Sequence, residues 1–178
     1  MTLFQIRIAG EGGQGLVTAG RILAEAAILA GYNATQNQVY GPQSRGGASR
    51  SDVIISSEEI GFPLTQELDF LLLLSSEAYR RYLPGAGPQC RIIADRGIET
   101  DNRPEDVTWM PLVDTARTHT GGQLAAGVVA IGVLQPLLGG IDADSLRRAL
   151  MARIPERHRT ANLEALEAGV KLCRGVAV

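Results

Sequence analysis

The chain has 178 residues, of which 45% are hydrophobic and 20% charged, and its net charge is −2. A chain of this length buries an adequate core without disulfides or metals. Its nearly balanced charge gives no long-range attraction to nucleic acids or anionic membranes. The composition therefore indicates an ordinary globular protein, and we expect residues 1–178 to form one domain.

Cysteine usage and the chain's opening segment indicate a reducing compartment. Cys90 and Cys173 lie far apart and form no CxxC pair, which predicts no disulfide framework, metal site or iron–sulfur ligand set. A strand-like segment, and not a basic-then-apolar leader, opens the chain, so we expect it in the cytoplasm. The apolar stretch over residues 124–138 is shorter than the roughly 18 residues that a membrane span needs. Its small residues favour a buried helix or a subunit-interface helix.

Strand and helix patterns alternate along the first two thirds of the chain. Residues 3–9 predict a strand, and residues 16–30 have helical spacing before Gly31, which stands where a C-cap glycine belongs. Further strands are predicted to end at residues 39–40 and to cover residues 53–56, 68–74, 91–94 and 107–110. A short helix, N-capped by Ser76, is expected after the strand over residues 68–74.

The last third of the chain is predicted to be helical from Thr120 onward. The apolar helix over residues 124–138 precedes Asp142, a candidate cap for a helix over residues 144–153. Pro155 interrupts the pattern before a final amphipathic helix. Alternating strands and helices followed by a helical tail predict an α/β fold, a single three-layer Rossmann-like domain with a mostly parallel sheet.

A glycine-rich loop, GEGGQG over residues 10–15, satisfies GxGxxG between the first strand and the first helix. Glycines allow a tight turn there, and free N–H groups at a helix start attract anions. The loop is therefore either a ligand-binding turn or a turn that needs glycine only for packing. A valine at Gly12 is expected to harm folding or assembly, because a β-branched residue resists positive φ and close backbone approach.

Two details count against a nicotinamide cofactor at this loop. No Asp or Glu stands at the end of the second predicted strand, over residues 36–40, where an acid would hold the adenosine ribose. Glu11 also places a carboxylate inside the proposed anion site.

A second loop, YGPQSRGG over residues 40–47, carries Arg45 and is followed by Arg50. Guanidinium groups beside flexible backbone suit a phosphate or a carboxylate, which they bind bidentately. We expect this loop to share one crevice with the glycine loop. The alternative is a solvated loop whose arginines pair with nearby acids.

Three segments together resemble the gamma subunits of 2-oxoacid:ferredoxin oxidoreductases. They are GEGGQG, VYGPQSRGGASRSDVIIS and LDFLLLLSSEAY, and the resemblance extends through NLEALEAG near the end. The segment RGGASRSDVIIS is most similar to the 2-oxoglutarate branch of the family, although the pyruvate and branched-chain branches share most of this segment.

The resemblance implies a reaction in which a 2-oxoacid, coenzyme A and oxidised ferredoxin give acyl-CoA, carbon dioxide and reduced ferredoxin. It implies that thiamine diphosphate, Mg²⁺ and iron–sulfur clusters are held by alpha, beta and delta-type subunits. It also implies that this chain has no catalytic residue of its own and helps to bind coenzyme A. We expect apolar surface left bare on the isolated chain to favour self-association. We expect ligand contacts from both loops: Gly10, Gly12, Gly13, Gln14, Gly15, Tyr40, Gly41, Arg45, Gly46 and Gly47.

Two other functions remain open at this point. A free-standing nucleotide- or dinucleotide-binding protein would use the glycine loop alone, and a purely structural subunit would use both loops only for packing. Neither nucleic acid nor a membrane is an expected partner.

Overall fold

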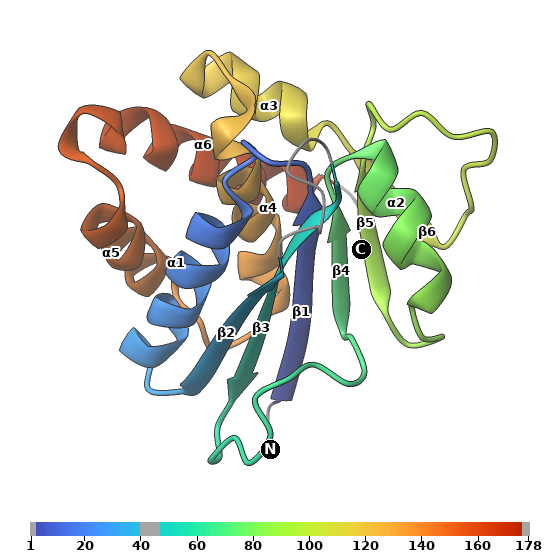
Figure 1. Cartoon of the computed structure of the whole chain (residues 1–178). Helices are drawn as coiled ribbons and strands as arrows, with labels where there is room; N and C mark the ends of the chain where they lie inside the picture. The colour runs from blue at the N-terminus through green and yellow to red at the C-terminus, as the bar shows by residue number, and fades with distance from the viewer. Residues whose placement is uncertain (1–2, 40–46, 176–178) are drawn as a thin grey trace.

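The computed structural model describes residues 3–39 and 47–175, which form a six-stranded sheet with helices on both faces (Figure 1). The strands are β1 (Leu3–Gly10), β2 (Asn33–Val39), β3 (Ser49–Ser56), β4 (Phe70–Leu73), β5 (Arg91–Asp95) and β6 (Val107–Met110). The helices are α1 (Leu16–Leu29), α2 (Ser76–Tyr82), α3 (Leu112–Thr120), α4 (Ala126–Leu134), α5 (Ala143–Arg153) and α6 (Glu156–Arg174).

The strand order is β2-β3-β1-β4-β5-β6. Strands β1, β4, β5 and β6 pair in parallel, whereas β3 lies between β1 and β2 and is antiparallel to both. The predicted α/β fold with a mostly parallel sheet and a helical tail is confirmed. The antiparallel β3 was not predicted, and it starts four residues earlier than the predicted strand, at Ser49.

The two faces of the sheet bury different clusters of side chains. On the first face, Ile6, Ile8 and Leu72 belong to the large core that α1, α3, α4, α5 and α6 complete. On the second face, Leu71 and Leu73 pack with Tyr79 and Tyr82 of α2 in a smaller core. The alternation follows from the period of two along a strand, which sends successive side chains to opposite faces.

Helix α4 is enclosed within the chain itself. All nine of its residues are buried, and its main contacts are with α6. The expectation of a buried helix over residues 124–138 is confirmed, but the helix is shorter, because 3₁₀ turns flank it at Gln123–Ala125 and Gln135–Leu137. Only Leu124, 69% exposed, offers a large apolar surface at its start. The expected subunit contact through this helix therefore has little bare surface to use.

The structure differs from the sequence analysis at the starts of two helices. Ser75, and not Ser76, N-caps α2, since its side chain accepts a hydrogen bond from Ala78 N, whereas the Ser76 hydroxyl accepts one from Glu99 N. Helix α3 was not predicted at all, because its start follows Pro111 and its sequence is largely polar. No helix in the described part of the chain is both long and apolar enough to cross a membrane.

The predicted cap at Asp142 is confirmed and gives the first testable prediction. Its Oδ1 accepts a hydrogen bond from Ser145 N at 2.7 Å and its Oδ2 one from the Ser145 hydroxyl at 2.9 Å. These bonds, the backbone one first, lower the pKa of Asp142. A carboxyl group with a lowered pKa stabilises the fold above its unfolded-state pKa of about 4, and this contribution disappears as the pH falls through the lowered value.

Asp142→Ala is therefore expected to reduce the free energy of unfolding at pH 7, and the difference from wild type should shrink below about pH 4. Urea unfolding at several pH values measures it. Asp142→Asn should keep most of the cap but lose this pH dependence. Asp144→Ala is the control, because Asp144 is an exposed acid in the first turn of the same helix that does not cap it. An equal loss from Asp142→Ala and Asp144→Ala would contradict the assignment.

Candidate functional site

The glycine loop connects the end of β1 to the start of α1 at the carboxyl edge of the parallel strands. Gly15 is the N-cap of α1 and has a left-handed conformation with φ 71°, and Gly13 has φ 89°. A Cβ on Gly15 would lie 2.2 Å from Leu124 O, so the loop is pressed against the segment before α4. Gly15 is required for both its conformation and this contact.

Gln14 braces the loop from inside. Its side chain is only 3% exposed; Oε1 accepts from Glu11 N at 2.8 Å and Nε2 donates to Leu74 O at 2.9 Å. Its backbone oxygen accepts from Gly127 N at 2.9 Å. A Cβ on Gly10 would meet Gln14 Oε1 at 2.1 Å. Gln14 therefore ties the loop to the end of β4 and the start of α4, and its amide is used within the chain.

Gly12 and Gly13 form the open part of the loop. Both are exposed, and nothing lies within 4 Å of a Cβ placed on either. Gly12 is not among the glycines with positive φ. The two reasons given against a side chain at Gly12, positive φ and close backbone approach, do not hold there and apply to Gly15 instead; the effect on assembly stays a prediction.

A cavity of about 200 Å³ opens beside the loop, at the ends of β4 and β5. Its wall includes three acids, Glu11, Asp95 and Asp114, and one arginine, Arg117. Arg117 pairs with Asp114 at 3.2 Å on the exposed surface. This charge distribution does not favour a phosphate group inside the cavity.

Asp95 is the buried acid of the cavity, 5% exposed. Burial raises its pKa, while hydrogen bonds from Val113 N and Gly97 N, both 2.8 Å, act in the opposite direction. Asp95 lies at the end of β5, where it both lines the cavity and forms a turn. It closes the turn after β5 and binds the first turn of α3.

The described ends of the second loop lie beside the glycine loop. Ser49, at the start of β3, pairs with Gly10, at the end of β1. Gly47 is partly buried, whereas the other four residues expected to bind a ligand in this loop lie outside the described residues: Tyr40, Gly41, Arg45 and Gly46. The described ends of the two loops therefore leave the sheet at one edge, while their shared crevice stays a prediction, because most of the second loop lies outside the described residues.

The strand order also fails to meet a requirement of a dinucleotide-binding site. In that motif the first two strands of the βαβ unit are neighbours in one sheet. Here β3 separates β1 from β2. Together with the missing acid at the end of β2, this arrangement argues against a free-standing dinucleotide-binding protein.

The sequence placed Glu11 at the proposed site but did not predict that Asp114, Ser75 and Ser76 line the cavity. Ser75 and Ser76 follow a strand that was predicted, so the sequence could have placed them at the carboxyl end of that strand, where the cavity opens. Asp114 and Arg117 lie on the unpredicted α3. Within residues 3–39 and 47–175, no group of three His, Cys, Asp or Glu side chains is arranged to hold a metal ion.

A pair of alanine substitutions tests the division of the loop into packed and open glycines. Gly15→Ala is expected to lower the free energy of unfolding by about 1–3 kcal/mol, because it combines an unfavourable φ with a backbone clash. Gly12→Ala is expected to change it by no more than about 0.5 kcal/mol. Chemical denaturation of both variants measures the difference. Equal effects of the two substitutions would refute the division.

Comparisons with known proteins agree with this geometry. Residues 5–172 match the family model of pyruvate ferredoxin/flavodoxin oxidoreductases. The 2-oxoglutarate synthase subunit KorC of Archaeoglobus fulgidus is 39% identical, over 96% of this chain and 88% of that one. The gamma subunit of a keto/oxoacid ferredoxin oxidoreductase from Geobacter sulfurreducens is 34% identical, with a TM-score of 0.85 and 98% of each chain covered.

A third comparison is with a much longer chain. The 2-oxoglutarate:ferredoxin oxidoreductase of Magnetococcus marinus, solved with 2-oxoglutarate, coenzyme A and succinyl-CoA bound, is 26% identical with a TM-score of 0.86. The match covers 99% of this chain but 32% of that one. With the family model covering most of its length, the chain belongs to the pyruvate ferredoxin/flavodoxin oxidoreductase family, in which it corresponds to the gamma subunit.

Proposed function

We propose that this chain is the gamma subunit of a multi-subunit 2-oxoglutarate:ferredoxin oxidoreductase. The observation that carries the proposal is the 39% identity to a 2-oxoglutarate synthase subunit over nearly the full length of both chains. The proposed reaction joins the oxidative decarboxylation of 2-oxoglutarate to thioester formation with coenzyme A. The electrons pass to ferredoxin.

The chemistry itself belongs to the partner subunits in this proposal. Thiamine diphosphate, Mg²⁺ and iron–sulfur clusters would be held by alpha, beta and delta-type subunits, as the family resemblance implies. The gamma subunit would complete the enzyme's surface and help to receive coenzyme A. A purely structural role without any ligand is the competing function, and it is favoured by the packing roles of Gly10, Gln14 and Gly15.

The charge around the two loops divides the proposed coenzyme A contacts between them. Glu11 is exposed on the glycine loop, and Asp95 and Asp114 line the same cavity. Carboxylates repel the pyrophosphate of coenzyme A, so we assign the phosphate contacts to the arginine-bearing loop over residues 40–47. The open backbone of Gly12 and Gly13 remains accessible to an uncharged part of the same molecule.

Arg45→Ala tests this assignment in the assembled enzyme. Loss of one charge-assisted contact costs about 1.5–3 kcal/mol, so the Michaelis constant for coenzyme A should rise roughly tenfold to a hundredfold. The constant for 2-oxoglutarate should stay nearly unchanged, because that substrate meets thiamine diphosphate in other subunits. Steady-state kinetics with both substrates varied gives the two constants.

Arg148→Ala is the matched control, since Arg148 is an exposed arginine on α5. It should alter neither constant. If Arg45→Ala assembles normally and keeps the wild-type constant for coenzyme A, the ligand-free structural role is the better account. If the assembled wild-type enzyme turns over another 2-oxoacid and not 2-oxoglutarate, the substrate assignment fails while the subunit assignment stands.

A further inference from the structure

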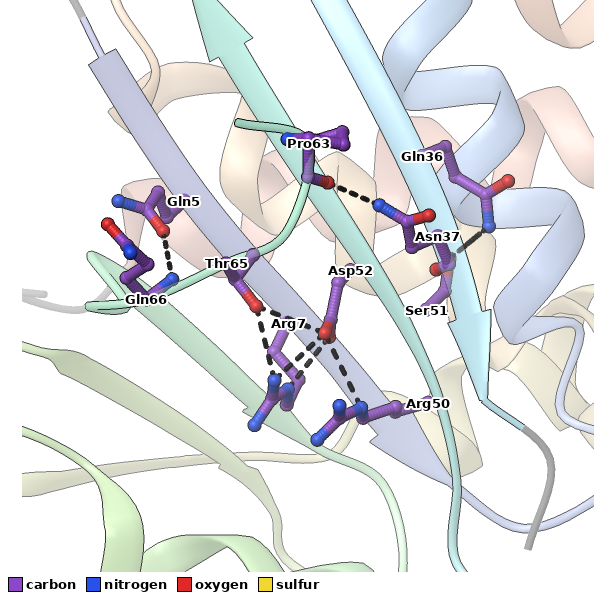
Figure 2. Close-up of polar contacts among 10 residues, drawn as sticks. All are labelled: Gln5, Arg7, Gln36, Asn37, Arg50, Ser51, Asp52, Pro63, Thr65 and Gln66. Carbon is purple, nitrogen blue, oxygen red and sulfur yellow. Dashed lines mark hydrogen bonds and ion pairs between the residues drawn. The ribbon is translucent and has the colours of Figure 1, made fainter. Parts of the chain in front are cut away.

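One half of the sheet's second face carries no helix among the described residues. Among the described residues, helix α2 packs on this face against β1 and β4, whereas β2 and β3 are crossed only by the segment over residues 57–68 (Figures 1 and 2). That segment is attached through backbone and side-chain contacts: Pro63 O accepts from Asn37, and Gln66 N donates to Gln5 Oε1 at 2.6 Å. Three arginines lie on the same face beside it: Arg7, Arg50 and Arg81.

An ion pair lies at the centre of this surface. Arg7 binds Asp52 with two hydrogen bonds, Nε to Oδ1 at 2.7 Å and Nη2 to Oδ2 at 2.8 Å. The Thr65 hydroxyl donates to the same Oδ2 at 3.1 Å, and Arg50 Nε lies 3.4 Å from it. Figure 2 shows Arg7 and Arg50 pointing to Asp52 from the neighbouring strands β1 and β3. Among the described residues, Asp52 is therefore the one carboxylate that pairs with both of these arginines.

A third arginine joins them around one aromatic ring. The guanidinium carbons of Arg7, Arg50 and Arg81 lie 5.4, 5.6 and 5.5 Å from the centroid of the Tyr82 ring. We call these three residues with Tyr82 the arginine cluster. Arg81 is exposed on α2.

The arginine cluster has more positive charge than the described residues balance. Asp52 is the only acid in ion-pair contact with it, so its net charge is positive. Asp69 lines a cavity with Arg7, but its Oδ2 accepts from Gln5 N at 2.7 Å. Arg50 Nε is buried and has no hydrogen-bond partner among the described residues. Partly buried like charges repel one another, and an added carboxylate would relieve that repulsion.

Two large apolar side chains stand on the crossing segment. Phe62 and Leu64 are 54% and 52% exposed. Arginine and aromatic residues are enriched at the centres of protein interfaces, whereas unpaired charge is disfavoured there. A partner that fits this surface must therefore bring carboxylates for the arginine cluster and apolar side chains for Phe62 and Leu64.

We propose that the arginine cluster, Phe62 and Leu64 form the docking surface for an acidic segment of a partner subunit of the same enzyme. The proposal rests on the proposed function, since it needs a multi-subunit complex. The longer Magnetococcus marinus chain supports it, because two thirds of that chain lies outside the matching part and is available to pack against this domain. Here the equivalent contact would be made between separate chains.

The experiment compares two charge reversals on one helix. Arg81→Glu is expected to weaken binding of the chain to the purified partner subunits at least tenfold, with a reduced dependence of the affinity on salt. Arg80→Glu is the control, because Arg80 is exposed on α2, carries the same charge and is not one of the contacts of Tyr82. It should change the affinity by less than about threefold. Surface plasmon resonance at two salt concentrations measures both.

Each result other than the expected one shows which assignment is wrong. If wild type does not bind the partner subunits, the proposed function fails. If wild type binds and both reversals have the same effect, the docking surface is elsewhere and the subunit assignment stands. Phosphate that stabilises wild type but not Arg81→Glu against heat, without competing with the partner, would replace the proposal with a small-anion site. A dimer of the isolated chain that Arg81→Glu alone dissociates would make the occupant a second copy.

Discussion

Close contact between backbone atoms around α4 determines how the helical layer can lie on the sheet. A Cβ on Gly132 would be 2.3 Å from Leu166 O, and one on Gly169 would be 2.2 Å from Val129 O, so α4 and α6 meet at their glycines. A Cβ on Gly127 would likewise lie 2.9 Å from Gly15 O. Because α4 is enclosed on every side, the glycine loop, α6 and the first face of the sheet are held in one arrangement.

The two halves of the sheet follow different physical rules. Strands β4 and β5 are parallel, short and buried, and Phe70 to Leu73 are all apolar, as a parallel strand covered on both faces requires. Strand β3 is antiparallel to both of its neighbours, and antiparallel strands tolerate a polar face. This difference explains why Asp52 and Arg7 can occupy the centre of a sheet. It also explains why the second face lacks a full helical layer there.

Much of the fold could be predicted from periodicity and from local turn chemistry. The strand over residues 68–74, the cap at Asp142 and the left-handed Gly31 each depend on neighbouring residues, so their signals are local. The antiparallel insertion of β3 and the packing of α4 against α6 depend on contacts distant in sequence, which a single chain does not reveal. The same limit applies to the site. GxGxxG indicated a ligand turn, but the packing contacts of Gly10 and Gly15 are with Leu74 and Leu124.

Negative and positive groups have different roles in this molecule, because they lie in different places. At the carboxyl edge of the parallel strands, Asp95 is fixed by hydrogen bonds from Gly97 N and Val113 N, and burial raises its pKa. A carboxyl group occupied by two structural hydrogen bonds holds α3 in place and is poorly placed to act on a substrate. Positive charge is found instead in the second loop, whose sequence contains Arg45, and in the arginine cluster on the second face of the sheet. A subunit built in this way acts on its complex through its surfaces, because buried polar groups such as Gln14 and Asp95 are occupied in holding its own fold together.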